Sequence, residues 1–357
     1  MKNIITISGI RPDFIRMSEI FKKLDANFNH TLIHSGQHYD ALLSDVFFTD
    51  LKIRKPNFNL NIGAQGKKHY QQVSDLTSGV IELIENEKLN PDLIVFLGDS
   101  NSVLASVPLR KEGYKIAHIE AGMRSFDKRM FEEINRTVCD TVSTYHFVYH
   151  KNYKEHLINE GMNPDNIHIV GNTICEVVEP FAYDLLSQTK EKSYILADVH
   201  RPENFNSKDR LTNIILYLNM LSGKFNVPVK LLYFPRLASK LEEYNIDLGN
   251  VKIIPLMPYK GYITSVYHAL CLVSDSGTAQ EEPAFLKTPV IVPRDFSERP
   301  ESEDYLNSYR INVNDINFSW EHSVDMIENE RFNFDTSWMT DGHSTSDKII
   351  NILKEVL

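Results

Sequence analysis

Charged and polar side chains recur at one kind of place in this sequence, shortly after a short apolar run that is typical of a β-strand. Seven such positions follow seven predicted strands: Arg11, Gln37, Asp99, Glu120, His200, Arg236 and Ser276. Ligands bind at the carboxyl ends of the strands in open parallel sheets, so we expect these side chains to line a ligand site. A single such residue has an ordinary structural explanation, whereas seven in register favour a function.

Carboxylates dominate the group between residues 99 and 133. Asp99 follows one predicted strand, Glu120 follows the next, and Glu132 and Glu133 open the helix after that. Burial and mutual repulsion raise carboxylate pKa values toward neutrality, which is what a general acid or base requires. We therefore predict proton transfer here.

A structural alternative exists for the glutamate at position 120. Its carboxylate would form an ion pair with Arg124 or Arg136, and such pairs also perturb pKa values. Taken together with the other strand-end residues, chemistry is the favoured interpretation.

A second group of residues fits a nucleotide. Ser276-Gly277-Thr278 precedes a predicted helix and offers free N–H groups, hydroxyls and the positive end of the helix dipole to a phosphate. Glu281 or Glu282 can accept both hydroxyls of a ribose, while Arg11, Arg236 and His200 can neutralise a pyrophosphate. The alternatives are a helix cap by Ser276 and a favourable first-turn charge on the glutamates.

Several well-defined chemistries lack their motifs. Neither G-x-G-x-x-G nor G-x-x-x-x-G-K-[ST] occurs, so dinucleotide cofactors and P-loop chemistry are unsupported. No H-E-x-x-H and no clustered cysteine and histidine residues offer a metal site. We predict neither a cofactor nor a metal.

Composition narrows the class of protein further. The chain has 357 residues and a net charge of -10, which disfavours nucleic acid and anionic membranes as partners. Cys139, Cys175 and Cys271 lie far apart in apolar contexts, as in a reducing compartment. The first residues show no signal-peptide pattern and no run reaches the length of a membrane span, so we predict a cytoplasmic protein.

Strands alternate with helices along the whole chain, which predicts parallel sheets covered by helices on both faces. Apolar runs predict strands at residues 4–8, 31–34, 93–97, 115–119, 146–149 and 167–170, and then at 194–199, 229–233, 251–254, 270–273 and 290–292. Gly171-Asn172-Thr173 interrupts the alternation. We therefore predict an N-terminal domain at 1–171, a C-terminal domain at 172–342, and a last helix within 343–357 that packs back on the first domain.

Nine short motifs, in this order and spacing, give the sequence a family resemblance over nearly its whole length. They are Gly9-Ile10-Arg11-Pro12, Gly36-Gln37-His38, Gly98-Asp99-Ser100, His118-Ile119-Glu120-Ala121-Gly122-Met123-Arg124, Glu132-Glu133-Ile134-Asn135-Arg136, Gly171-Asn172-Thr173, His200-Arg201-Pro202-Glu203, Asp275-Ser276-Gly277-Thr278-Ala279-Gln280-Glu281-Glu282 and Glu298-Arg299-Pro300-Glu301. The chain resembles the non-hydrolysing UDP-N-acetylglucosamine 2-epimerases.

The resemblance implies an architecture and a reaction. The architecture is GT-B, an α/β fold of two Rossmann-like doubly wound domains with the active site in the interdomain cleft, and the usual assembly is a homodimer. The reaction is C2 epimerisation of a UDP-2-acetamido sugar, UDP-GlcNAc to UDP-ManNAc, which supplies surface polysaccharide synthesis. UDP leaves to give a 2-acetamidoglycal and then adds back, and no cofactor or metal takes part.

The resemblance also implies roles for individual residues. The proton-transfer groups are drawn from Asp99, Glu120 and Glu132, and His200 aids the departure of UDP. The positions that match substrate-binding residues are Arg11, Arg16, Gln37, Arg136, Arg236, Ser276, Gly277, Thr278 and Glu282.

Departures from the family pattern leave more than one UDP-sugar as a candidate substrate. Arg16 stands where a lysine is common, Pro235-Arg236 lies in a segment that usually carries a histidine, and Thr278 replaces a second glycine. The last two features resemble relatives that act on UDP-N-acetylfucosamine. The 36–40 segment and the 124–127 loop resemble relatives that act on UDP-diacetamido-uronic acids.

Other classes of protein are less favoured. A GT-B glycosyltransferase needs only one catalytic acid or base, whereas this chain has a set of three carboxylates. A binding protein that had lost catalysis would be expected to lack one of them. A hydrolysing 2-epimerase shares the first step and differs in admitting water to the intermediate.

Overall fold

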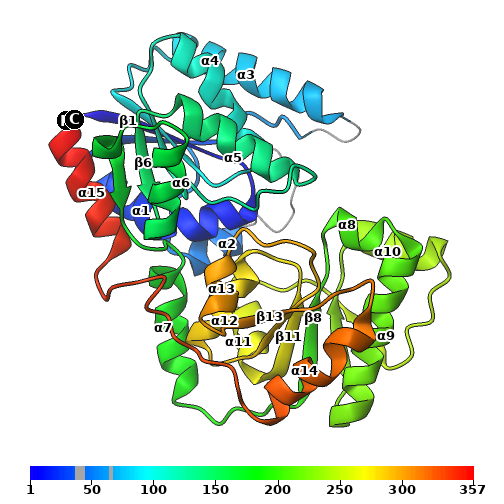
Figure 1. The fold of residues 1–357 in the computed structure, drawn as a ribbon. Coiled ribbons are helices and arrows are strands. Elements are labelled where there is room, and N and C mark those ends of the chain that lie inside the picture. The colour runs from blue at the N-terminus through cyan, green and yellow to red at the C-terminus, as the bar shows by residue number, and fades with distance from the viewer. Residues whose placement is uncertain (37–44, 64–66) are drawn as a thin grey trace. The chain divides into compact units, whose positions relative to one another are not determined.

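A computed structural model describes residues 1–36, 45–63 and 67–357 of the chain (Figure 1). The described residues form two compact units. The first comprises Met1–Val177 together with Met339–Leu357, and the second comprises Val178–Trp338. Helix α7, Cys175–Leu186, begins in the first unit and ends in the second.

The first unit is built on a parallel sheet to which the described residues contribute seven strands, in the order β3-β2-β1-β4-β5-β6-β7. The strands are β1 Asn3–Ser8, β2 Asn29–His34, β3 Phe58–Asn59, β4 Leu93–Leu97, β5 Ile116–Ile119, β6 Tyr145–Val148 and β7 Ile167–Ile169. The helices are α1 Arg11–Asn27, α2 Asp45–Asp50, α3 His69–Asn86, α4 Ser106–Lys111, α5 Phe131–Val142, α6 Lys151–Asn159 and α15 Thr345–Val356, with short 3-10 turns at Asn101–Ala105 and Pro164–Asn166.

The second unit repeats this plan with a described sheet of six parallel strands in the order β10-β9-β8-β11-β12-β13. The strands are β8 Tyr194–Asp198, β9 Val229–Leu232, β10 Val251–Ile254, β11 Ala269–Ser274, β12 Val290–Val292 and β13 Ser308–Arg310. The helices are α8 Pro202–Phe205, α9 Lys208–Phe225, α10 Pro235–Glu243, α11 Tyr259–His268, α12 Glu282–Phe285, α13 Pro300–Asp304 and α14 Ile316–Glu328, with a 3-10 turn at Thr278–Gln280.

The strand order reverses once in each sheet. In the first unit β1 pairs with both β2 and β4, with Ile7 opposite Ile33 and Thr6 opposite Val95. In the second unit β8 pairs with both β9 and β11. Crossovers of the same hand that lead to opposite sides of such a strand lie on opposite faces of the sheet. The carboxyl ends of the strands on either side of the reversal therefore border a crevice.

The strands are apolar because both faces of each sheet are covered. All five residues of β4 are buried, and its Ile94 and Phe96 belong to the core of the first unit. The second unit has its own core, to which Ile195, Ala197 and Val273 contribute. Parallel sheets covered on both faces favour such continuous apolar strands.

The border between the units lies six residues later than the sequence predicted. Residues 172–177 group with the first unit, not the second, because their side chains and backbone are tied to it. Ile174 and Cys175 are buried, and the Asn172 amide donates to the Met339 carbonyl at 2.8 Å. The glycine at 171 marks a turn and not the end of the unit.

The last helix belongs to the first unit. Figure 1 shows α15 beside α1, and Lys23 of α1 lies 2.6 Å from the carboxylate of Asp347. Ile349, Ile350 and Leu353 form its buried face. Within the ranges that the structure describes, no helix combines the length and apolar content needed to cross a membrane.

Candidate active site

Six of the seven predicted strand-end residues follow the carboxyl end of a parallel strand. In the first unit Arg11, Asp99 and Glu120 follow β1, β4 and β5; in the second, His200, Arg236 and Ser276 follow β8, β9 and β11. The seventh, Gln37, lies outside the described residues. Five of these residues therefore follow β1 or β8, where the strand order reverses, or a strand next to one of them, and Glu120 follows β5, one strand further along the first sheet.

The glutamate after β5 is held in an unusual conformation. Glu120 has φ 70°, in the left-handed region that a residue with a side chain rarely adopts, and it is almost fully buried. This backbone costs about 1–2 kcal/mol for a residue other than glycine. Such costs persist where the surrounding structure fixes the residue, and they concentrate at functional sites.

Glu120 forms an ion pair with Arg16, a partner that the structural alternative did not name. The Arg16 guanidinium lies 3.3 Å from Oε2 of Glu120, and both side chains are buried. Helix α1 directs Arg16 inward among Phe14, Ile15 and Met17, which are also buried. The Arg16 guanidinium therefore compensates the charge of the buried Glu120 carboxylate.

Tyr149, near Glu120, carries no prediction from the sequence, whereas Asn172 and Thr173 were named only as part of a family motif. The Tyr149 hydroxyl donates to Oε2 of Glu120 at 3.3 Å and lies 2.7 Å from the hydroxyl of Thr173. Arg16 donates to Oδ1 of Asn172 at 3.3 Å. The Gly171-Asn172-Thr173 motif thus supports the glutamate and its arginine, and its position after β7, at the same edge of the sheet, is the signal that marks it.

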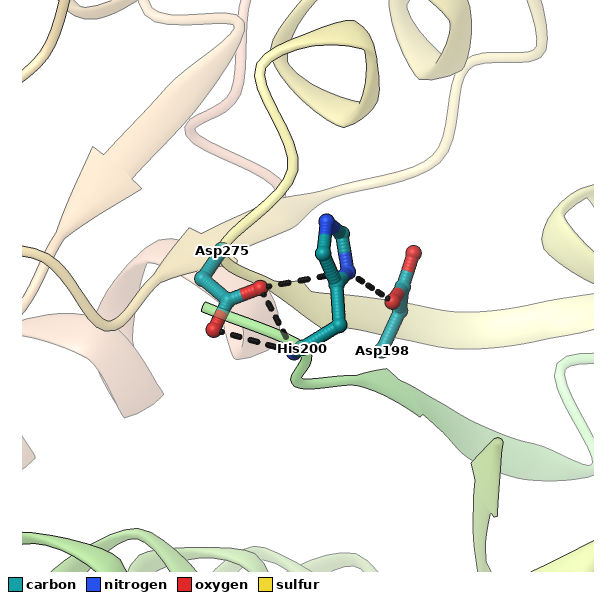
Figure 2. A group of neighbouring side chains, drawn as sticks. All are labelled: Asp198, His200 and Asp275. Atoms are coloured by element: carbon teal, nitrogen blue, oxygen red, sulfur yellow. Dashed lines mark hydrogen bonds and ion pairs between the residues drawn. The ribbon is translucent and has the colours of Figure 1, made fainter. Parts of the chain in front are cut away.

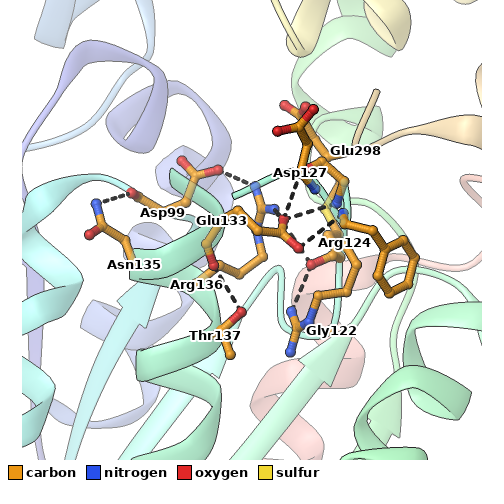
Figure 3. A network of polar contacts seen from close by, with 12 residues as sticks. Asp99, Gly122, Arg124, Asp127, Glu133, Asn135, Arg136, Thr137 and Glu298 are labelled. Atoms are coloured by element: carbon orange, nitrogen blue, oxygen red, sulfur yellow. Dashed lines mark hydrogen bonds and ion pairs between the residues drawn. The ribbon is translucent and has the colours of Figure 1, made fainter. Parts of the chain in front are cut away.

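Asp99 is paired with a buried arginine (Figure 3). Arg136 of α5 is completely buried and bonds the Asp99 carboxylate with one Nη, while its other Nη lies 3.4 Å from Glu133. Asn135 donates to the Asp99 backbone carbonyl at 2.9 Å. Helix α5 therefore fixes both the side chain and the backbone of this aspartate.

The two glutamates at the start of α5 have different surroundings. Glu133 is buried and accepts from the backbone amides of Ser125 and Phe126 at 2.9 and 3.1 Å, so it anchors the preceding loop. Glu132 is half-buried in the first turn. Of the two, Glu132 has the exposure that contact with a substrate requires.

A buried aspartate joins the turns after β1 and β4. Asp13 accepts from the amides of Gly9 and Ile10 at 3.0 and 3.3 Å and from the Ser100 hydroxyl at 3.2 Å. Burial raises the pKa of Asp13 to about 7, although these donors oppose the shift. The carboxylate fixes the Ser100 hydroxyl, next in sequence to Asp99.

A buried histidine connects the turns after β4 and β5. His118 has Nδ1 2.6 Å from Asp140 and Nε2 2.7 Å from the Gly98 carbonyl. Both neighbours are acceptors, so both ring nitrogens carry hydrogen and the ring is cationic. Asp140 also accepts from the Gly122 amide at 3.1 Å and pairs with Arg124 at 2.8 Å.

The pKa values of this pair move apart. Burial opposes the charge on His118, but the adjacent Cys139 and Asp140 outweigh it and raise the pKa of the imidazole well above its usual value. Burial likewise opposes the charge on Asp140, and His118 and Arg124 outweigh it to lower the pKa of that carboxyl to about 2. The turns that carry Asp99 and Glu120 thus rest on one fixed ionic group.

In the second unit, the histidine after β8 is bracketed by two aspartates (Figure 2). Nδ1 of His200 is 2.8 Å from Asp198 and 3.4 Å from Asp275. Burial lowers the pKa of His200, but the charges of Asp198 and Asp275 outweigh it, so the pKa is raised. The ring also lies 5.0 Å from Phe234, centroid to centroid.

Possible ligand atoms of Asp198, His200 and Asp275 lie within 4.8 Å of one another, a spacing that also suits a metal ion. However, both Asp275 oxygens already accept backbone N–H groups, from His200 at 3.0 Å and Arg201 at 3.0 Å. Its Oδ2 additionally accepts from Asn204 at 2.8 Å. We therefore interpret the cluster as a hydrogen-bonded network.

The turn after β11 differs from its prediction. Thr278–Gln280 is a 3-10 turn and α12 has four residues, so the continuous helix whose dipole was expected at this turn is not present. Pro283 enters at the start of α12, and Lys287 adopts φ 52° just after its end. Ser276 does not cap a helix either, since Gly277 occupies the cap position. This turn therefore offers a phosphate no helix dipole, and the Ser276 amide already donates to the Ser274 hydroxyl at 3.1 Å.

The two candidate ribose acceptors also differ. Glu281 is buried and lies 2.7 Å from Nε of Arg299, which makes it part of an ion pair. Glu282 accepts from the Tyr259 hydroxyl at 2.6 Å and is also buried. Arg236 lies in the first turn of α10, with its guanidinium 5.4 Å from the centre of the Phe205 ring.

Alternating charges run behind this turn. Arg299 lies 2.8 Å from Glu298, whose other oxygen is 3.2 Å from Arg294, and Arg294 reaches Glu203 at 3.4 Å. A Cβ on Gly277 would lie 2.9 Å from Cζ of Arg299, so the turn packs directly on the arginine. The Glu298-Arg299 motif therefore supports the turn from beneath.

Comparison with known proteins identifies the family. A sequence profile described as UDP-N-acetylglucosamine 2-epimerase matches residues 22–354. The chain belongs to the UDP-N-acetylglucosamine 2-epimerase family. Members of this family are enzymes, and the resemblance drawn from the sequence motifs is confirmed.

Two relatives of the family illustrate its range. The chain is 34% identical over 320 residues to a UDP-N-acetylglucosamine 2-epimerase of Methanococcus maripaludis, covering 85% of this chain and 86% of that protein. It is 35% identical over 304 residues to a UDP-2,3-diacetamido-2,3-dideoxy-D-glucuronate 2-epimerase of Pseudomonas aeruginosa, covering 83% and 84%. Members of the family are therefore named for more than one sugar nucleotide.

A solved member of the 2-epimerase family has the same fold. The UDP-GlcNAc 2-epimerase of Methanocaldococcus jannaschii, solved in complex with UDP-GlcNAc and UDP, matches with a TM-score of 0.89 at 30% identity, covering 99% of this chain and 100% of that one. The predicted fold class, two Rossmann-like doubly wound domains of the GT-B kind, is confirmed.

Proposed function

We propose that this member of the 2-epimerase family interconverts UDP-GlcNAc and UDP-ManNAc. The observation that supports this most is Glu120, a carboxylate fixed in a left-handed backbone at the end of β5 beside Arg16. A buried acceptor kept in a costly conformation is what abstraction of a weakly acidic proton calls for.

The chemistry explains why more than one carboxylate is needed. The C2 proton of a 2-acetamido sugar is not adjacent to a carbonyl, so direct removal is very slow. Cleavage of the anomeric C1–O bond sends its electron pair to the β-phosphate of UDP, and the electrons of the C2–H bond then form the double bond of a 2-acetamidoglycal. Reprotonation from the other face and return of UDP complete the inversion.

Two faces of the sugar require two proton-transfer groups. We assign them among Asp99, Glu120 and Glu132, with Glu120 as the base for one face. Arg136 beside Asp99 and Arg16 beside Glu120 supply matched positive charge. Anionic catalytic groups next to an anionic substrate benefit from such neighbours, which offset their mutual repulsion.

The nucleotide is assigned to the second unit and to arginines of both. Ser276, Gly277, Thr278 and Glu282 would hold UDP, with His200 at the leaving group, and Arg11, Arg16, Gln37, Arg136 and Arg236 complete the proposed binding set. An arginine can form bidentate hydrogen bonds with a phosphate or carboxylate, and in this structure Arg16 and Arg136 are buried and lie against Glu120 and Asp99. That one substrate meets residues of both units, in the interdomain cleft, is part of the proposal.

One alternative substrate has specific support. The Pseudomonas aeruginosa relative, at 35% identity, is named for UDP-2,3-diacetamido-2,3-dideoxy-D-glucuronate. Its reaction also inverts C2 beside an acetamido group, so the same acids would serve. UDP-N-acetylfucosamine is retained as a third candidate on the Pro235-Arg236 and Thr278 positions.

Proton NMR in deuterated water tests the proposal. Incubation with UDP-N-acetylglucosamine is expected to give a manno-configured UDP-sugar that carries deuterium at C2. Free UDP with free sugar would instead indicate a hydrolysing enzyme. Turnover of the diacetamido-uronate or N-acetylfucosamine nucleotide alone would move the substrate to that branch, and no turnover of any of the three would refute the function.

Assembly, location and pathway belong to the same proposal. We infer a homodimer in the cytoplasm that supplies activated sugar for surface polysaccharide, on the strength of the family resemblance. Light scattering coupled to size-exclusion chromatography is expected to give twice the 41.2 kDa mass of one chain. A monomer that turns over substrate would remove the dimer from the proposal.

A further inference from the structure

The surroundings of His200 follow from strand register. Strands β8 and β11 pair in parallel with Asp198 opposite Ser274. Asp275 directly follows Ser274, and His200 lies two residues after Asp198, at the same edge of the sheet. Two carboxylates from neighbouring strands are thereby brought to one imidazole.

The two carboxylates contact different parts of the turn. Asp275 is completely buried, accepts the amides of His200 and Arg201, and donates its own amide to the Asp198 carbonyl at 3.1 Å. It fixes the backbone of the turn. Asp198 instead contacts the ring, with Oδ1 2.8 Å from Nδ1.

This contact determines which ring nitrogen is available. A carboxylate is an acceptor, so the Nδ1 that faces Asp198 carries hydrogen. The other nitrogen, Nε2, is then the one that can exchange a proton with a bound ligand. Figure 2 shows Nε2 pointing away from both aspartates, and the His200 side chain is 30% exposed, so this nitrogen is open to a ligand.

We propose that Asp198 is a positioning residue that fixes the ring of His200 with Nδ1–H inward, so that Nε2–H donates its proton to the departing UDP. The inference rests on the proposed function. When the C1–O bond breaks, its electron pair moves to the β-phosphate oxygen, the proton of Nε2 is transferred to that oxygen, and the neutral imidazole regains it when UDP adds back. No other reactant is consumed.

The charges around the ring agree with this role. Asp198 and Asp275 face Nδ1, and Arg201 is the nearby cation that opposes them. The two carboxylates outweigh both burial and Arg201, so the pKa of His200 is raised and the donor form extends to higher pH. Phe234 covers one side of the ring and adds no charge.

Replacement of Asp198 by asparagine removes the charge with little change in shape. We expect kcat of Asp198→Asn to fall by about tenfold or more, with a smaller change in KM, because the proton donor is weakened rather than the binding surface. Protonated His200 is lost as pH rises through its pKa. Removing a charge that raises that pKa therefore moves the alkaline limb of the kcat profile to lower pH.

Asp247→Asn is the matched control. Asp247 lies in a surface turn of the same unit, where it accepts from the Gly249 amide at 3.0 Å, and it has no part in the proposed site. The same change of charge there is expected to leave kcat and its pH profile as in the wild type. A shifted profile in this control would mean that net charge alone explains the effect, and would overturn the inference.

Nitrogen-15 NMR of labelled histidines gives a readout that does not depend on turnover. With the His200 signal assigned from a His200→Gln variant, the wild type is expected to show the Nδ1–H form when neutral, and Asp198→Asn a lower titration midpoint. An unchanged midpoint, or a neutral ring protonated at Nε2 in the wild type, overturns the inference even if kcat falls.

The two proposals fail in different ways. Wild-type protein that turns over none of the UDP-2-acetamido sugars refutes the proposed function, and the leaving-group role with it. Active wild type together with an Asp198→Asn variant of unchanged kcat or unchanged alkaline limb refutes the role of Asp198 alone.

Discussion

The candidate sites of the two units occupy the same topological position and have opposite patterns of charge. In the first unit the functional groups are carboxylates held by arginines, with Glu120 beside Arg16 and Asp99 beside Arg136. In the second, the functional group is an imidazole held by carboxylates, Asp198 and Asp275. Each functional group therefore lies beside a side chain of opposite charge.

This difference suits two kinds of proton transfer. Proton removal requires an acceptor that carries negative charge, whereas proton donation requires a donor that carries a proton, and the carboxylates beside His200 raise the pKa of its imidazole. One reaction that removes a proton from carbon and supplies one to a leaving group needs both states at the same pH. The same fold can provide both because the residues that follow the strands, and not the strands themselves, supply the chemistry.

The largest effect is expected from Glu120→Gln, which removes the acceptor but keeps its shape. Loss of a general base typically costs about 10²–10⁴ in rate, so we expect kcat to fall by about 1000-fold with the fold intact. Stopped assays by NMR and circular dichroism measure both. Glu155→Gln, an exposed change in the first unit, is the control; wild-type activity in Glu120→Gln would remove this residue from the mechanism.

Replacement of Arg136 by methionine removes a completely buried cation from the first unit, in which carboxylates are paired with arginines. Removal of one partner from a buried ion pair costs about 3–5 kcal/mol, because the remaining charge is left uncompensated. We expect the free energy of urea unfolding to fall by this amount. Arg129→Met, at a residue whose side chain is 69% exposed, is expected to change it by less than about 0.5 kcal/mol, and equal losses in both would contradict the argument.

A smaller, pH-dependent effect is expected at His118. The pKa of His118 is raised in the folded chain, so its stabilisation is full below pH 6.5, the unperturbed value, and is lost as pH rises through the folded pKa. His118→Gln is expected to cost about 1–3 kcal/mol at pH 6 and less at pH 9. Urea unfolding at both pH values measures this.

The exposed His343 offers a matched control for that measurement. His343→Gln is expected to change the free energy of unfolding little at either pH. A His118→Gln cost that stays constant from pH 6 to pH 9 would show that the ring contributes through packing and not through its charge.

Sequence alone predicted eleven of the thirteen described strands and the polar residues that follow them; the short strands β3 and β13 were not predicted, because neither contains an apolar run. Every predicted strand is present. A short apolar run bounded by glycine and polar residues is typical of a strand in a parallel sheet that is covered on both faces. The placement of Asp99, Glu120 and His200 at carboxyl ends followed from this alternation alone.

Partners across the fold could not be predicted in the same way. Glu120 pairs with Arg16, which is 104 positions earlier in the chain, and this depends on which face of α1 packs toward β5. The nearby Arg124 and Arg136 were better candidates by sequence distance, yet each is committed to another carboxylate. Asp198 was overlooked because it forms the last residue of a strand whose other residues are apolar.

The first unit is interrupted in sequence by the second, and this has a consequence for synthesis. Residues 178–338 form a continuous unit that leaves the ribosome whole, whereas the first unit lacks α15 until residues 345–356 have been made. Domains generally fold as units during synthesis. The second unit can therefore fold first, and a chain that stops before residue 345 lacks the buried face of α15 in the unit that was begun first.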